Sequence, residues 1–227
     1  MITIKSFQSI VARLLAGAGI LFLSSCSKSN SPSGGARIMY VNACVGATAT
    51  SLTVNGNTLS NAGSVPYLGN SGYQTVGAGS VSLSSVLTGV GTLGSVNATL
   101  GNSSYSVFVG GTVLADTLVL IADGLPASTG NYAYARLVNV SSDSTATAIT
   151  GAVGNTVVGS NVAYGAASGF VQVSPGSYSL TAFNVNKPGN VATLSSVQLN
   201  GGQIYTLLYS GNSNASVGFK LTVINNN

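Results

Sequence analysis

The chain has 227 residues, of which only 4% are charged: seven are Lys or Arg, three are Asp, and Glu and His are absent. This composition excludes a nucleic-acid-binding surface, because displacing phosphate counterions requires clustered Lys and Arg. The absence of His removes the commonest general base and zinc ligand. The sequence therefore predicts a protein that is not an enzyme and that has no metal site and no cofactor.

Residues 1–25 have the features of an export signal. Two basic residues precede a ten-residue apolar run at 14–23, which is too short to span a membrane. The sequence LSSC at 23–26 follows and resembles the bacterial lipobox, in which the cysteine is acylated and becomes the first residue. We expect residues 1–25 to be removed and Cys26 to carry lipid; the alternative is an ordinary secretory peptide.

The predicted mature chain begins with the acylated Cys26 and a polar tether, at 26–35. The nine residues SKSNSPSGG of the tether span about 15–18 Å as a flexible coil, enough to clear the lipid headgroups. Ser27, rather than an aspartate, follows the cysteine, which predicts the outer membrane. The periplasmic and cell-surface faces both stay open. If Cys26 is lipidated, Cys44 has no disulfide partner, and we expect it to be a small buried hydrophobe.

The predicted strands begin at Ala36-Arg37 and end, in the first half, with the stretch at 118–121. Between them, Asn55-Gly56 follows an apolar stretch and predicts a hairpin turn, because both residues tolerate positive φ. The segment 72–76 predicts a strand, followed by a turn at 77–79 and another strand from Val81.

The second half repeats the first. Val65–Leu83 aligns without a gap on Val162–Leu180, and nine of the nineteen pairs are identical by direct count. We also align Arg37 with Arg136 and Tyr105 with Tyr205, so the offset drifts from 99 through 97 to 100. Within the second copy, residues 177–182 alternate strictly between hydroxyl and apolar side chains, as a half-buried strand does.

These patterns predict an all-β protein with two tandem immunoglobulin-like β-sandwich domains, presented one after the other as a rod. The boundaries are 36–124 for repeat 1, 125–134 for a linker and 135–227 for repeat 2. Each repeat holds about seven or eight short strands with frequent turn signals, which suits a sandwich of this size. A parallel β-helix is disfavoured because the internal period is near 100 residues rather than about 20.

The second copy carries a Val-Asn pair after Ala135-Arg136, a Val-x-Tyr-Gly element at 162–165, Gly169-Phe170, and Pro-Gly-x-Tyr at 175–178. This arrangement resembles the domain-of-unknown-function family numbered 4397, which occurs in tandem in envelope lipoproteins, often of Bacteroidetes. The resemblance covers nearly all of 36–227 and is stronger in the second copy. It implies a fold and a location, but no active site.

Two further sets of residues are candidates for sites, whereas a pair of carboxylates is not. Asp116 and Asp123 flank one predicted strand about 23 Å apart, too far for a catalytic carboxylate pair. Tyr132 and Tyr134 would share one face of an extended segment and could stack on sugar rings; packing between the domains is the favoured alternative.

Asp116-Thr117-Leu118 and Asp143-Ser144-Thr145 resemble the O-glycosylation acceptor pattern of Bacteroidetes, with Thr117 and Ser144 as acceptors. Taken together, the sequence predicts a non-enzymatic outer-membrane lipoprotein with a structural, adhesive or protein-interaction role. The alternative is a carbohydrate-binding accessory lipoprotein of a glycan-uptake system. The predicted partners are the membrane, through the N-terminal lipid, and a glycan or another envelope protein; nucleic acid is excluded.

Overall fold

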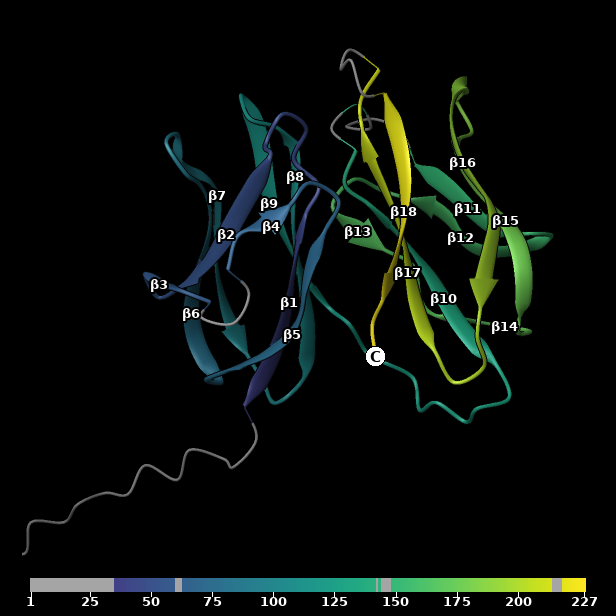
Figure 1. Cartoon of the computed structure of the whole chain (residues 1–227), viewed down its shortest axis with the longest axis horizontal. Coiled ribbons are helices and arrows are strands. Elements are labelled where there is room, and N and C mark those ends of the chain that lie inside the picture. The colour runs from purple at the N-terminus through teal and green to yellow at the C-terminus, as the bar shows by residue number, and fades with distance from the viewer. Residues whose placement is uncertain (1–34, 60–62, 142, 144–147, 214–217) are drawn as a thin grey trace, which may run out of the picture. The chain divides into compact units, whose positions relative to one another are not determined.

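The computed structural model describes residues 35–59, 63–141, 143, 148–213 and 218–227. These residues form strands and connecting turns with no α-helix, which confirms the all-β prediction (Figure 1). No described segment is a helix long and apolar enough to cross a membrane.

Each repeat is a sandwich of two sheets. In repeat 1 the strands are β1 (Ala36–Asn42), β2 (Ala49–Val54), β3 (Asn57–Thr58), β4 (Val65–Pro66), β5 (Asn70–Val76), β6 (Gly79–Leu87), β7 (Gly91–Leu100), β8 (Ser104–Thr112) and β9 (Ala115–Ala122). We call β5-β1-β8-β9 the first inner sheet and β3-β2-β6-β7 the first outer sheet, in which β4 also pairs with β2.

Repeat 2 follows the same plan. Its strands are β10 (Ala133–Asn139), β11 (Ile149–Val153), β12 (Thr156–Val162), β13 (Ala166–Ala167), β14 (Val171–Val173), β15 (Gly176–Asn184), β16 (Lys187–Leu199), β17 (Ile204–Gly211) and β18 (Phe219–Asn225). The second inner sheet is β13-β10-β17-β18, with β14 also paired to β10, and the second outer sheet is β12-β11-β15-β16. Strand β10 begins at Ala133, so the last two residues of the predicted linker belong to a strand.

The first strand of each repeat lies inside its inner sheet rather than at an edge. Strand β1 pairs antiparallel with β5 and parallel with β8, and β10 pairs parallel with β17 in the same way. Parallel neighbours require a long connection, which the outer sheet of each repeat supplies. The layering is therefore that of an immunoglobulin-like sandwich, with the N-terminal strand in a central position.

The local predictions explain how the outer sheets form. Asn55 and Gly56 have φ angles of 51° and 80°, so the predicted Asn-Gly hairpin joins β2 to β3. Along β15, Leu180 and Ala182 are buried while Ser179 is exposed, as the strict alternation predicted.

Cys44 is a free cysteine, fully buried in the apolar core of repeat 1, which confirms its prediction as a small hydrophobe.

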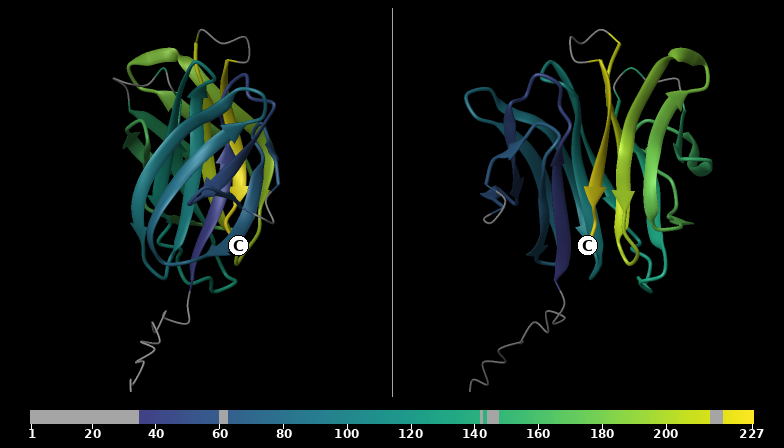
Figure 2. Two further views of the ribbon diagram at one scale, coloured as in Figure 1. Left: turned by 90° about the vertical axis from the view of Figure 1, so that its left-hand side faces the viewer. Right: turned by 45° about the vertical axis from the view of Figure 1, so that its right-hand side comes forward.

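The two repeats do not follow one another as a rod: their inner sheets pack face to face (Figures 1 and 2). One apolar cluster joins both, and its buried members are Met39, Val41, Ala43, Phe108, Val119, Val138, Val140, Leu208 and Ile224. We call this packing the seam. The cause is visible in β1, which is apolar on both faces: Ile38 and Tyr40 fill the core of repeat 1, while Met39 and Val41 enter the seam.

The alignment of the two arginines was wrong by two residues. Ile38 lies opposite Tyr105 in the sheet, and Ala135 lies opposite Tyr205. The offset in the first strand is therefore 97, the same as in the repeated segment, and Met39 is the counterpart of Arg136. The Ala-Arg dipeptides misled the alignment because they are identical by chance, whereas backbone pairing places them at different positions.

Candidate functional site

The described residues contain no group of three or more metal-ligating side chains. Asp116 lies within β9, and Asp123 directly follows that strand and is buried. Asp143 is the third acid, and its carboxylate accepts hydrogen bonds from the backbone N–H and the hydroxyl of Ser213. The three carboxyl groups thus have separate surroundings, and the structure offers two other features: an exposed hydroxyl-lined sheet face and a buried polar cluster.

The exposed face of the first outer sheet carries rows of short polar side chains. Strands β6 and β7 pair so that hydroxyl or amide groups lie directly opposite one another, in the pairs Ser80 with Thr99, Ser82 with Asn97 and Ser84 with Ser95. Side chains at such positions are about 5 Å apart and alternate with core residues along each strand. The alternation places the apolar neighbours Val81 and Leu83 in the core.

A shallow depression crosses this face next to the β2–β3 hairpin. Its lining includes Asn55, Ser80, Ser82, Asn97 and Thr99. The Asn55 side-chain oxygen accepts the N–H of Ser82 at 2.8 Å, and the Asn55 N–H donates to the Ser82 carbonyl at 2.8 Å. These two bonds fix the hairpin against the sheet, so the amide of Asn55 extends the row formed by Ser82 and Asn97. We call the exposed polar residues of this depression the hydroxyl face; they are Asn55, Ser80, Ser82, Asn97 and Thr99.

The hydroxyl face can donate and accept hydrogen bonds but carries no charge. Ser and Thr hydroxyls do both, and Asn adds two donors and an acceptor. Such a surface suits an uncharged polar ligand, for example the hydroxyl groups of a sugar chain, and offers nothing to attract phosphate.

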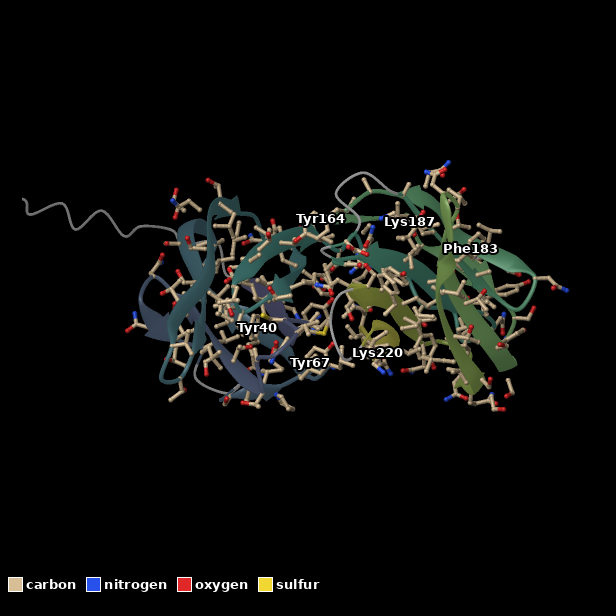
Figure 3. All side chains as sticks on the ribbon, turned by 90° about the horizontal axis from the view of Figure 1, so that it is seen from above. Tyr40, Tyr67, Tyr164, Phe183, Lys187 and Lys220 are labelled. Carbon is tan, nitrogen blue, oxygen red and sulfur yellow. The ribbon has the colours of Figure 1, made fainter. Side chains whose placement is uncertain are left out.

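The equivalent face of repeat 2 differs at one end. Ser177, Ser179 and Thr181 on β15 occupy the places of Ser80, Ser82 and Ser84. Further along the strand, however, Phe183 pairs with Val191, which is 48% exposed, so this end of the face is apolar. Figure 3 shows Phe183 and Lys187 projecting from this region.

A buried polar cluster lies in the seam. Arg136, only 1% exposed, donates to Asp123 Oδ1 from Nη2 at 2.5 Å, the one salt bridge found in the described part of the chain. Its Nε donates to Thr206 Oγ1 at 3.0 Å, and Thr206 donates in turn to Asn226 Oδ1 at 2.7 Å. A charged pair removed from water is costly unless its remaining donors and acceptors are satisfied, and this network satisfies them.

Tyr73 closes the network from the side of repeat 1. Its hydroxyl donates to Asp123 Oδ2 at 2.6 Å and accepts from Asn226 Nδ2 at 3.1 Å. Burial, followed by the nearby Asp123 charge, raises the pKa of Tyr73 to about 12. The Arg136 guanidinium also stacks on Phe170, 4.7 Å from the ring centre, a favourable cation–π contact. Sequence reasoning missed this cluster; the available signal was the scarcity of acids, which makes any buried arginine a candidate partner for Asp123.

A family model for a domain of unknown function, DUF4397, matches residues 36–150 and again residues 133–227. The chain belongs to the DUF4397 family. The two matches correspond to the two sandwiches and overlap at 133–150, which includes β10. The tandem resemblance inferred from the sequence is thus confirmed.

No curated protein matches this DUF4397 chain. Among solved structures, a crystal structure of a candidate cell adhesion protein from Bacteroides fragilis aligns with 84% of this chain and 97% of its own. The identity is 13% and the TM-score is 0.25, values too low to infer a shared fold or a shared role.

The predicted tyrosine pair does not form an exposed platform in this DUF4397 protein. Tyr132 is 44% exposed, but Tyr134 is only 8% exposed, and its hydroxyl accepts a hydrogen bond from Gln172 at 3.0 Å. Tyr134 lies in β10, where both faces of the strand are covered. A stacking site for two sugar rings at these residues is therefore absent.

The other predicted sites fall in different places. Cys26 and Ser144 lie outside the described residues. Thr117 is exposed on β9, opposite Gly110 of β8, so its hydroxyl is accessible. Burial raises the pKa of the Cys44 thiol to about 12, which suppresses the nucleophilic thiolate.

Proposed function

We propose that this protein is a non-enzymatic lipoprotein of the bacterial outer membrane, anchored through lipid on Cys26, with a structural or adhesive role. The observation that carries the adhesive role is the hydroxyl face of the first outer sheet. A regular, uncharged array of hydroxyl and amide groups on a rigid sheet can make many weak hydrogen bonds at once. Attachment of this kind gains strength from the number of contacts rather than from a single deep pocket.

The packed seam supports the same proposal. A lipid at Cys26 and a tether at 27–35 would hold the body close to the membrane surface. Because the repeats share the seam, the outer sheets are the faces left to meet a partner. Their rows of Ser and Thr carry no charge, so the attachment should depend little on salt concentration.

The alternative is a carbohydrate-binding accessory lipoprotein of a glycan-uptake system. The depression lined by Asn55 and Asn97 favours it, because amide side chains are suitable partners for sugar hydroxyls. The missing two-ring platform argues against it, since stacking on aromatic rings would supply much of the affinity for a sugar.

Location is tested first, by protease treatment of intact cells that express the full-length protein, with a periplasmic protein as the integrity control. Loss of the protein from intact cells places it on the surface, and survival until the outer membrane is opened places it in the periplasm. Cys26→Ala is the matched variant: it should abolish incorporation of labelled palmitate and release the protein from membranes. Retention of both label and membrane association would contradict the anchor.

Adhesion is tested on cells that carry variants of the two outer faces. Ser82→Glu places a charge in the centre of the hydroxyl face, and Ser179→Glu makes the same change at the equivalent position of repeat 2. We expect Ser82→Glu to reduce attachment to surfaces coated with neutral polysaccharide at least several-fold, with Ser179→Glu near wild type. Equal attachment by all three proteins would contradict an adhesive role for this face. Tight binding of a soluble oligosaccharide at the same face would favour the alternative.

A further inference from the structure

We propose that the seam is a specific docking interface between unlike repeats, in which Asp123 and Arg136 select pairing of repeat 1 with repeat 2 over pairing of like repeats. The partner of each inner-sheet face is thus the inner-sheet face of the other repeat. It can come from the same chain or from a second copy of it.

The two faces that meet in the seam are equivalent surfaces of the two repeats. Val41 pairs with Phe108 in the first inner sheet, and Val138 pairs with Leu208 at the same place in the second. All four side chains belong to the single apolar cluster of the seam. The same surface patch is therefore used from both sides, which is the arrangement of a symmetric dimer.

The polar positions break this symmetry. Arg136 of repeat 2 has Met39 as its counterpart in repeat 1, because of the offset of 97 in the first strand. Asp123 and Asn226 are also counterparts, since each directly follows the last strand of its repeat. Each also donates its N–H to the first residue of the neighbouring strand, Ser104 at 2.9 Å and Ile204 at 2.8 Å. One repeat thus supplies the acid and the other supplies the base.

Pairing of like repeats would leave each buried charge without an opposite charge. Two copies of repeat 1 would bring each Asp123 carboxylate against Met39, and two copies of repeat 2 would bring each Arg136 against Asn226. An uncompensated charge in a dry interface is strongly unfavourable. Pairing of unlike repeats instead joins the two charges and adds a second bond across the seam, from Asn226 Nδ2 to the Tyr73 hydroxyl at 3.1 Å. The ion pair therefore acts as a specificity device that penalises the wrong partner.

The linker then decides whether docking occurs within one chain. Residues 124–132 connect the repeats and hold them at a high effective concentration, so the intact chain should be monomeric. If the linker is cut, the seam alone must keep the repeats together, and the choice of partner becomes measurable.

The test uses the full chain with a protease site inserted between Ala127 and Ser128, which are both exposed. The folded protein is cut, isotopically labelled and unlabelled batches are mixed under mild urea until the label has exchanged, and native mass spectrometry counts the pairs. We expect pairs of repeat 1 with repeat 2 to exceed like pairs at least tenfold. Separation into single repeats, or a statistical mixture of pairs, would overturn the proposal.

Variants test whether the Asp123–Arg136 ion pair causes the preference for unlike pairs. Asp123→Asn with Arg136→Met gives each position the residue of its counterpart, Asn226 and Met39, and should bring like pairs close to the statistical share. Asp123→Asn alone is nearly isosteric and provides the same test, with a smaller rise in like pairs, if the double variant does not fold. Asp143→Asn removes the acid that contacts Ser213 rather than the seam cluster, and should behave as wild type. A wild-type ratio of pairs in both Asp123 variants would also overturn the proposal.

Discussion

Asn42 and Asn139 make the same hydrogen bonds at the same place in the two repeats. Each amide donates to the carbonyl of the valine that begins the repeated segment, Val65 at 3.1 Å and Val162 at 3.0 Å. Each side-chain oxygen accepts the N–H of the residue two positions later, at 3.2 Å for Asn42 and 3.1 Å for Asn139. The end of the first strand is thereby tied to the start of the repeated segment in both sandwiches.

Replacing either asparagine should therefore destabilise the protein. Asn42→Ala and Asn139→Ala each remove the acceptor of a buried N–H and a donor to a buried carbonyl, and we expect each to lower the free energy of unfolding by about 2–3 kcal/mol. Urea denaturation measures the change. Asn97→Ala, on the exposed face of β7, is the control and should change stability by less than about 0.5 kcal/mol. Equal effects at Asn42 and Asn97 would contradict the role of the buried amide.

Stability should fall at high pH. Burial is the main cause that raises the pKa of Tyr40, Tyr73 and Cys44 to about 12, from ordinary values of 10.0 for the phenols and 9.0 for the thiol. A group whose pKa is raised on folding contributes its full stabilisation below the unfolded pKa and loses it as the pH approaches the folded pKa. The urea midpoint should hence decline between about pH 9 and pH 12. A midpoint that stays constant over this range would show that these groups are not protected by the fold.

Gly94 should not tolerate a side chain. A Cβ at this position of β7 would lie 2.7 Å from the backbone nitrogen of Leu118 in β9, where the edges of the two sheets of repeat 1 approach each other. Gly94→Ala must push these strands apart, at a cost of about 1–3 kcal/mol in the free energy of unfolding. Gly77→Ala is the matched control, because no atom lies within 4 Å of the corresponding Cβ. If both variants unfold at the same temperature, the close approach of β7 and β9 is wrong.

Tyr132 and Tyr134 should behave differently although they are two residues apart. Tyr134→Ala removes a buried ring and the partner of Gln172, and we expect a loss of about 3 kcal/mol in the free energy of unfolding. Tyr132→Ala truncates a half-exposed ring and should cost less than about 1 kcal/mol. Thermal or urea unfolding of the two variants gives the comparison. A larger loss at Tyr132 would contradict the burial of the two rings.

The sequence alone was sufficient for the fold class, the internal repeat and the local turns. The Asn55-Gly56 hairpin and the alternation along β15 depend on φ preferences and on the twofold period of a strand, both of which act over a few residues. The burial of Cys44 could likewise be expected from its apolar neighbours.

Only the tertiary structure decided how the repeats combine. Whether Arg136 is a surface charge or half of a buried ion pair depends on Asp123, thirteen residues away and in the other repeat, and no local pattern encodes that distance. The position of Met39 was also undetermined by the sequence, because an apolar side chain can pack either in the core of one sandwich or in the seam. Local preferences determine which residues form strands, whereas the pairing of faces depends on long-range burial and charge compensation, which appear only once the sheets have packed.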